Sequence, residues 1–410
     1  MSHRIDLPLL HDHHTHTSLY AALEGLPDLR GLAAGEARAL LAAQPRDRLG
    51  LVKGWRNDRL ALGAADLAEL PPLVIVNASL HGHALTPAAL PFVAELWPEF
   101  AERWADPAWA ERNLPRLFVF YGRVAGLGPE KLAAHMGALE AVGLGSTEDL
   151  ITAGSEALAV IAASPYRDRV SSWATPEVYE TLSASERAAL RGVKLFVDGS
   201  LGAKSAALGR PFLGGEPGVL VRDGNRLGGD VLRAASDGAG VAVHAIGELA
   251  VELAIRAFET ARREGLSIPL ARIEHAQFIT RDQAFRARDL GVVLSMQPNF
   301  NADSVDYVDR LPAPLPERND PFRMLIDEAG FVPGRDLVFG SDGMPHGPEN
   351  ALQWSLFPAV PGQRLSLDEL IAGYGPARGI GSPLAGGGIT LSIDDDARTV
   401  RLLAPERTES

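Results

Sequence analysis

The sequence predicts an α/β fold in which eight parallel strands, each followed by a helical segment, close into a barrel. Short apolar runs alternate with longer stretches rich in Ala, Leu, Glu and Arg, which is the pattern of a parallel sheet with crossover helices. The length of 410 residues suits an elaborated barrel better than a single small core. Polar residues follow several apolar runs, where a (β/α)8 TIM barrel carries its functional side chains.

The first half of the chain is the less regular part. We predict the first strand at residues 7–11, where it runs into a cluster of histidines. Residues 20–128 are predicted to form one long insertion after this strand. The insertion contains two strand-like runs, LVIVNA at 73–78 and LFVFYG at 117–122. Strands 2, 3 and 4 are predicted at residues 143–150, 168–175 and 192–200.

The second half shows the alternating pattern more clearly. Strands 5 to 8 are predicted at residues 240–248, 271–278, 291–298 and 336–343. The barrel with its insertion is therefore expected over residues 1–385. Residues 386–410 are expected to form a tail with a hairpin around residues 394–396.

Composition limits the classes of function. Hydrophobic residues make up 46% and charged residues 22%, as in ordinary globular proteins. The absence of cysteine excludes disulfides and thiolate metal sites, so a metal must be held by His, carboxylate or modified lysine. A net charge of −13 argues against nucleic acid as a partner. Neither a membrane-length apolar run nor a signal-peptide pattern at the start is found, so we expect a cytoplasmic location.

Five residues of metal-ligand type lie at predicted strand ends. His14 and His16 are two positions apart, so in an extended segment both imidazoles face one side. His244 and His275 end strands 5 and 6, and Asp342 follows strand 8. Each has a plainer explanation when taken alone: the histidines can be solvated, core or rim residues, and the aspartate can cap a turn. Their common position at strand ends favours a metal site.

Lys194 lies between apolar neighbours on predicted strand 4, in a chain that contains four lysines. A buried lysine is costly unless it is neutralised, paired or modified. One interpretation is a salt bridge to Asp198 or another carboxylate. The other is carbamylation by CO2, which turns the cation into an anion with two oxygens able to bridge two metal ions.

The order of these residues along the chain resembles that of the amidohydrolase superfamily. The sequence motifs around them are most similar to those of its YtcJ-like branch, the amidohydrolase 3 group. The insertion motifs GW at 54–55 and HGHAL at 81–85 also resemble that branch. The matching segments are DHHTH at 12–16, VKLFVDGSLGAKSAAL at 193–208, VHAIGELAVELAI at 243–255, RIEHAQFI at 272–279 and FGSDGMPHGPENAL at 339–352.

The resemblance implies a binuclear metal centre. His14, His16 and Asp342 would bind the more buried metal, His244 and His275 the second, and carbamylated Lys194 would bridge them. A hydroxide between the metals would attack the substrate, and Asp342 would take its proton and pass it to the leaving nitrogen. Zinc is the first expectation, with Mn, Fe or Co as alternatives.

The sequence departs from the family pattern at both ends, and it does not identify the substrate. About ten residues precede the histidine cluster, so the β-sandwich typical of the family is predicted to be reduced or absent. The insertion is expected to fold over the barrel mouth, with His83 and Trp55 as candidate substrate-binding residues. His11 and His13 alternate with His14 along the strand, so we expect them to face its other side and assign them no catalytic role.

The function predicted is hydrolysis of an amide-type C–N bond of a small molecule by a metal-bound hydroxide. A deaminase or a lactone or ester hydrolase would use the same residues, because one fold and metal site serves many substrates. A non-catalytic binding protein is the alternative from another class, and the presence of both Lys194 and Asp342 argues against it. A homodimer is left open.

The first testable prediction is the metal content. Because five ligand-type residues end predicted strands, the purified protein should carry about one to two divalent ions per chain. Elemental analysis of protein expressed with added zinc or manganese measures this. Protein free of metal under both conditions would contradict the predicted ligand set.

Overall fold

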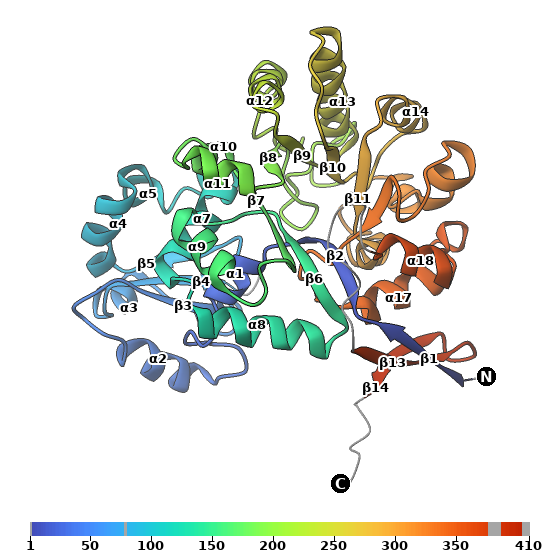
Figure 1. Cartoon of the computed structure of the whole chain (residues 1–410). Coiled ribbons are helices and arrows are strands. Elements are labelled where there is room, and N and C mark those ends of the chain that lie inside the picture. Colours follow the sequence, from blue (N-terminus) through green and yellow to red (C-terminus); the bar gives the residue numbers. More distant parts are fainter. Residues whose placement is uncertain (1, 78–79, 376–386, 404–410) are drawn as a thin grey trace. The chain divides into compact units, whose positions relative to one another are not determined.

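The computed structural model describes residues 2–77, 80–375 and 387–403. An eight-stranded parallel sheet forms a nearly closed barrel, which confirms the predicted (β/α)8 architecture (Figure 1). The amide of Asp342 donates to the carbonyl of His14 at 2.8 Å, joining the two ends of the sheet. The strands, in chain order, are β2 (Leu10–Thr15), β6 (Leu144–Asp149), β7 (Val170–Ala174), β8 (Gly192–Phe196), β9 (Gly240–Ala245), β10 (Ala271–His275), β11 (Val293–Met296) and β12 (Leu337–Phe339).

Helices follow the strands and cover their outer side, as α12, α13 and α14 show in Figure 1. None of the helices in the described ranges is long and apolar enough to cross a membrane. The helices of this part are α8 (Pro129–Ala141), α9 (Ser155–Ala163), α10 (Pro176–Tyr179), α11 (Ala184–Ala189), α12 (Gly224–Ser236), α13 (Glu248–Arg263), α14 (Arg281–Asp289), α15 (Asp303–Asp306), α16 (Leu315–Arg318), α17 (Pro348–Leu356) and α18 (Leu367–Gly373).

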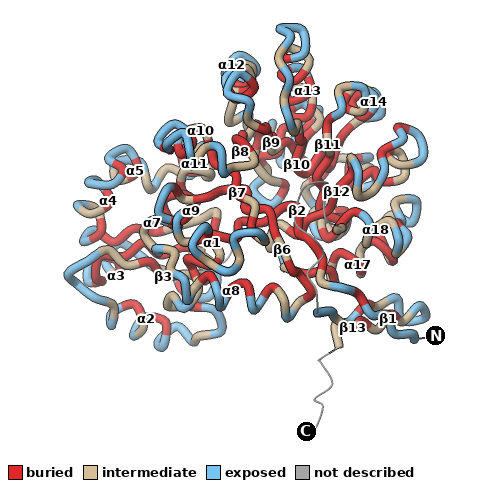
Figure 2. Tube along the Cα trace, in the orientation of Figure 1, coloured by how far each residue is buried: buried red, intermediate tan, exposed pale blue. Residues whose placement is uncertain are grey.

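The longest helix shows why this sequence packs on the barrel. In α13 the buried apolar residues recur at helical spacing, as in Val251, Ala254, Ile255 and Phe258, so one stripe faces the sheet. The strands beneath are buried on both faces, because helices cover one side and the barrel interior the other (Figure 2). The rigid strands therefore fix the positions of the side chains at their ends.

The predicted first strand, residues 7–11, was wrong in its bounds. β1 (Ser2–Pro8) belongs to a separate antiparallel sheet with β13 (Gly388–Asp394) and β14 (Thr399–Leu403), whereas the barrel strand β2 begins at Leu10. All six residues of β2 are buried although four are His or Asp, so an apolar pattern could not reveal it. The hairpin predicted around residues 394–396 is confirmed, and the rest of the 386–410 segment outside 387–403 is not among the described residues.

A second compact unit comprises Ser18–Leu132, the region of the predicted insertion. Its three-stranded sheet consists of β3 (Gly50–Trp55), β4 (Leu73–Asn77) and β5 (His83–Leu85). The strand-like run at 73–78 is thus a strand over its described residues, and Ala78 lies outside them. The helices of this unit are α2 (Ala34–Ala42), α3 (Ala64–Ala68), α4 (Leu90–Leu96), α5 (Pro98–Arg103), α6 (Pro107–Arg112) and α7 (Leu114–Ala125), and α1 (Thr17–Ala22) leads into it.

The strand expected at residues 117–122 was wrong, because this run lies within helix α7. Leu117, Phe120 and Tyr121 stand at positions i, i+3 and i+4 and pack into one buried cluster of the second unit. A short apolar run fits either a buried strand or a buried helix, and here the tertiary packing selects the helix.

The second prediction concerns the close contact between β8 and β9. A Cβ built on Gly192 would lie 2.0 Å from the carbonyl oxygen of Gly240, its partner in the ladder. Gly192→Ala should therefore lower the melting temperature, because the backbones must separate at a cost of about 1–3 kcal/mol.

The matched control is Gly229→Ala in α12, an exposed helical position with nothing within 4 Å of the new Cβ. This change should raise stability by about 0.5–1 kcal/mol, because alanine loses less backbone entropy in a helix. Equal effects of the two substitutions in thermal unfolding would contradict the close packing of β8 against β9.

Candidate metal centre

Three ligand-type side chains from distant parts of the chain converge at one end of the barrel. His14 comes from β2, His275 ends β10, and Asp342 follows β12. One nitrogen or oxygen atom of each lies within 4.8 Å of the others. Because parallel strands bring their carboxyl ends to one face, residues far apart in sequence can bind one ligand.

The two other histidines of the predicted set lie beside this group. Nε2 of His16 is 3.2 Å from Oδ1 of Asp342, and Nε2 of His14 is 3.6 Å from the same oxygen. The ring of His244 is 4.4 Å from that of His275, measured between ring centroids. Nε2 of His244 donates to the carbonyl oxygen of Gly199 at 3.1 Å, which leaves Nδ1 as its remaining ligand atom.

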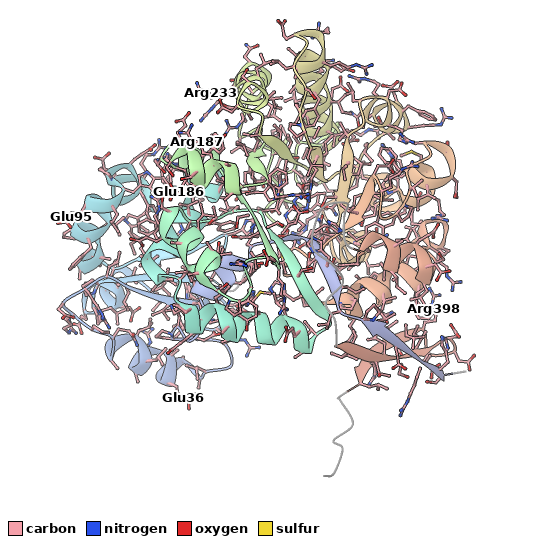
Figure 3. The ribbon with its side chains drawn as sticks, in the orientation of Figure 1. Glu36, Glu95, Glu186, Arg187, Arg233 and Arg398 are labelled. Carbon is pink, nitrogen blue, oxygen red and sulfur yellow. The ribbon has the colours of Figure 1, made fainter. Side chains whose placement is uncertain are left out.

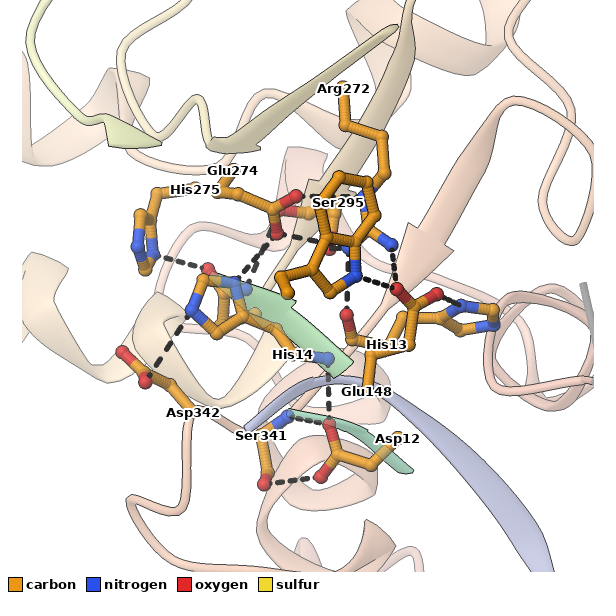
Figure 4. Close-up of polar contacts among 12 residues, drawn as sticks. Asp12, His13, His14, Glu148, Arg272, Glu274, His275, Ser295, Ser341 and Asp342 are labelled. Carbon is orange, nitrogen blue, oxygen red and sulfur yellow. Dashed lines mark hydrogen bonds and ion pairs between the residues drawn. The ribbon is translucent and has the colours of Figure 1, made fainter. Parts of the chain in front are cut away.

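Hydrogen bonds to Nδ1 fix the orientation of two of the imidazoles (Figure 4). Nδ1 of His14 donates to Oε2 of Glu274 at 2.7 Å, and Nδ1 of His275 donates to Oε1 of Gln297 at 2.7 Å. A carboxylate and an amide oxygen only accept, so each ring carries its proton on Nδ1 and presents the lone pair of Nε2. This arrangement is typical of metal-binding histidines.

The backbone at two of these residues adopts an unusual conformation. His275 has φ of 70° and Asp342 has φ of 55°, both in the left-handed region. Non-glycine residues there are strained, and such strain is concentrated at functional sites. The sharp turn at each strand end directs the side chain into the group, which no sequence pattern indicated.

Lys194 is fully buried on β8, and its Nζ has no hydrogen-bond partner among the described residues. The salt bridge to Asp198 does not form, because that carboxylate accepts backbone N–H groups of Ala207, Ile246 and Gly247. Burial lowers the pKa of Lys194 to about 8, although the carboxylates of Glu274 and Asp342 act in the opposite direction. The amine is therefore easily neutralised.

The electrostatics favour neutral imidazoles beside an ionised carboxylate. Burial lowers the pKa of His14, His244 and His275 well below the ordinary value, and the positive charge of Lys194 lowers each further. Burial raises the pKa of Asp342, but the attraction of His14 and His16 outweighs it and brings that pKa to about 2. Neutral imidazole and carboxylate are the forms that bind metals.

Sequence reasoning missed the buried charges beneath these ligands. Arg272 is almost fully buried and contacts Glu148 at 2.7 Å and Glu274 at 2.8 Å. Its guanidinium also donates to the carbonyl of His13 at 2.7 Å and to Oγ of Ser295 at 2.9 Å (Figure 4). Arg272 and Glu274 stand in the RIEHAQFI segment, and their placement inside an apolar strand was the available signal.

The two candidate pocket residues belong to the second unit. Nε2 of His83 bonds to the carbonyl of Trp104 at 2.9 Å, and Tyr121 Oη lies 3.1 Å from its Nδ1. Trp55 donates through Nε1 to the carbonyl of Leu60 at 2.8 Å. Both side chains therefore have structural contacts within their own unit, and their part in substrate binding stays a prediction.

A model of the amidohydrolase family matches residues 132–351, more than half of the chain. The chain is 36% identical to the protein LONG AFTER FAR-RED 3 of Arabidopsis thaliana over 127 residues, which is 30% of this chain and 22% of that protein. It is 36% identical to the putative amidohydrolase YtcJ of Bacillus subtilis over 122 residues, 29% of this chain and 23% of the other. The aligned segments thus span less than a quarter of these relatives.

Two solved structures share the fold. An uncharacterized metal-dependent hydrolase from Pyrococcus furiosus matches with a TM-score of 0.67 at 24% identity, covering 90% of this chain and 81% of that one. Its counterpart from Pyrococcus horikoshii matches with a TM-score of 0.64 at 24% identity, covering 91% and 78%. The similarity therefore extends over both units of the chain.

The third prediction tests the buried charge network. Arg272→Met should destabilise the protein by about 3–5 kcal/mol, because it leaves the carboxylates of Glu148 and Glu274 buried without a cation. Urea unfolding of the variant and the wild type measures the loss.

The control is Arg233→Met on α12. The side chain of Arg233 is 68% exposed (Figure 3) and that of its partner Glu180 is 56% exposed, so loss of the pair should cost about 0–1 kcal/mol. An Arg272→Met protein as stable as the Arg233→Met protein would contradict the importance of the buried arginine.

Proposed function

Because the chain belongs to the amidohydrolase family, we propose that it is a metal-dependent hydrolase that cleaves an amide-type C–N bond in a small molecule. The observation that carries the proposal is the convergence of His14, His275 and Asp342 within 4.8 Å, near a buried Lys194 amine that has no hydrogen-bond partner among the described residues. Neutral imidazoles and carboxylate at strand ends are suited to bind divalent ions. The same residues would otherwise be an expensive cluster of buried polar groups.

The donor atoms fit two ions. His14, His16 and Asp342 would hold one, since both histidine Nε2 atoms lie within 3.6 Å of Oδ1 of Asp342. His275 through Nε2 and His244 through Nδ1 would hold the second. Zinc suits this imidazole-rich set best, with Mn, Fe and Co as alternatives. A divalent ion lowers the pKa of bound water from 15.7 toward about 7 and polarises a carbonyl oxygen, which supplies a hydroxide nucleophile at neutral pH.

Lys194 is proposed to carry a CO2-derived carbamate. The neutral Nζ attacks the carbon of CO2, a C–N bond forms, and one proton leaves to solvent. The product is an anion whose two oxygens can each face one ion. Carbamylation also removes the cationic charge, which would repel a divalent ion a few Å away by several kcal/mol even at an effective dielectric near 20.

Asp342 is proposed as the proton-transfer residue. Its carboxylate is ionised at neutral pH and partly accessible, and it lies beside His16. An ionised carboxylate can accept the proton of the attacking water and then deliver it to the leaving nitrogen. Oδ1 of Asp342 lies 3.2 Å from Nε2 of His16 and 3.6 Å from Nε2 of His14, so the carboxylate stands within the group of proposed ligands.

The bond cleaved is tested by a substrate panel on metal-loaded enzyme. The panel contains N-acyl amino acids, N-substituted formamides and dipeptides as amides, adenine and cytosine derivatives as deamination substrates, and lactones. Turnover of an amide that disappears on chelation and returns with Zn²⁺ supports the proposal. Turnover confined to the deamination substrates or lactones would replace it with that reaction, on the same residues. A role of His83 and Trp55 in the pocket, a homodimer and a cytoplasmic location stay predictions.

The fourth prediction concerns Lys194 in the same assay. Lys194→Ala should abolish measurable activity and lose most of the second metal, and short carboxylic acids added with metal should restore part of both. Lys194→Arg should stay inactive, because guanidinium remains protonated and cannot form a carbamate. Lys194→Met keeps the packing of the side-chain stem and isolates the loss of the amine.

Kinetics with metal analysis of each variant measures these effects. A Lys194→Met enzyme with wild-type activity and two bound ions would rule out a bridging role. Density that ends at a plain amine in a metal-loaded crystal grown in air would do the same and would leave a mononuclear site.

A further inference from the structure

A second group of ligand-type atoms lies inside the barrel, away from the cluster of His14, His275 and Asp342. His11 and His13 on β2 face Glu148 on the neighbouring strand β6, and all three are at most 2% exposed. Oε1 of Glu148 is 3.5 Å from Nδ1 of His13 and 3.9 Å from Nε2 of His11. One donor atom of each residue lies within 4.8 Å of the others.

The other polar atoms of these side chains are already bound. Nδ1 of His11 lies 2.7 Å from Oγ of Ser146, and Nε2 of His13 donates to the carbonyl of Gly375 at 2.8 Å. Oε2 of Glu148 accepts from Trp173 Nε1 at 2.6 Å and contacts Arg272 at 2.7 Å. The atoms that face one another, Nε2, Nδ1 and Oε1, have no hydrogen-bond partner among the described residues.

The three inward-facing atoms have the chemistry of metal ligands. A carbonyl oxygen only accepts, so Nε2 of His13 carries a proton, and in the neutral form of the ring Nδ1 presents a lone pair toward a carboxylate oxygen 3.5 Å away. The other oxygen of Glu148 is fixed by Arg272 and Trp173, so Oε1 faces the two rings.

We propose that His11, His13 and Glu148 bind a divalent transition-metal ion at a structural site separate from the proposed catalytic centre. Two imidazoles and one carboxylate are a ligand set used by zinc and iron(II). Zinc–nitrogen bonds of about 2.0–2.1 Å at tetrahedral angles place ligand atoms about 3.4 Å apart, close to the 3.5 and 3.9 Å found between Glu148 and the two rings. The other polar atom of each ligand takes part in a hydrogen bond, as is typical of metal ligands.

The position of the site suggests what the ion does. The ladder between β2 and β6 has register shifts on both sides of His11 and Asp12, so regular backbone pairing is interrupted there. An ion held by both strands would join them at this interruption, directly before His14. The site is enclosed, so the ion stabilises the fold and takes no part in turnover. This inference does not depend on the proposed function.

The test compares metal stoichiometry among histidine variants. Wild type, His11→Gln and His3→Gln are loaded with Zn²⁺, desalted and measured for zinc per chain. His3 is the matched control because its side chain is 50% exposed on β1. His11→Gln should contain one zinc fewer than the other two proteins and should melt at a lower temperature. Equal zinc contents in all three proteins would overturn the proposal.

A second measurement covers the case in which His11→Gln fails to fold. Diffraction data are collected from crystals of the wild-type protein grown with ZnCl2, at X-ray energies above and below the zinc absorption edge. An anomalous peak bounded by His11, His13 and Glu148 supports the site. A map without that peak overturns it, whether or not zinc is found beside His14.

Discussion

The buried guanidinium of Arg272 is the interaction on which the rest of the barrel interior depends. It neutralises carboxylates from β6 and β10 and donates to the backbone of β2, so three strands are joined by one side chain. A cation and two anions in a low-dielectric interior must be paired closely, because each alone would carry a large desolvation cost. The exposed pair of Arg233 with Glu180 has no such consequence, because water screens it.

This network orients residues on two sides of β2. Toward the strand ends, Glu274 fixes the ring of His14 and so directs its Nε2 toward Asp342. On the other side, Glu148 faces His11 and His13. One arginine therefore holds the two carboxylates that support both groups of histidines. Successive side chains on a strand point to opposite sides, so adjacent histidines on β2 belong to different groups.

Much of the architecture could be predicted from the sequence. Seven of the eight barrel strands lie within the ranges predicted from the alternation of strand-like and helical segments. His244, His275 and Asp342 were recognised because they stand at the ends of predicted strands. Two expectations failed for one reason. Residues 117–122 form a continuous apolar run but lie in a helix, whereas β2 is a buried strand made mostly of polar residues. The hydrophobic pattern therefore predicts neither element correctly.

The sequence by itself determined the order of strands and helices and the residue types available at each strand end, because both depend on local periodicity and chemistry. Only the tertiary structure decided which of those residues meet. The partners Glu148, Gln297 and Arg272 come from different strands, and the left-handed turns at His275 and Asp342 depend on the surrounding packing. Proximity between distant segments is set by barrel closure and charge pairing in a dry interior, and no local pattern encodes it.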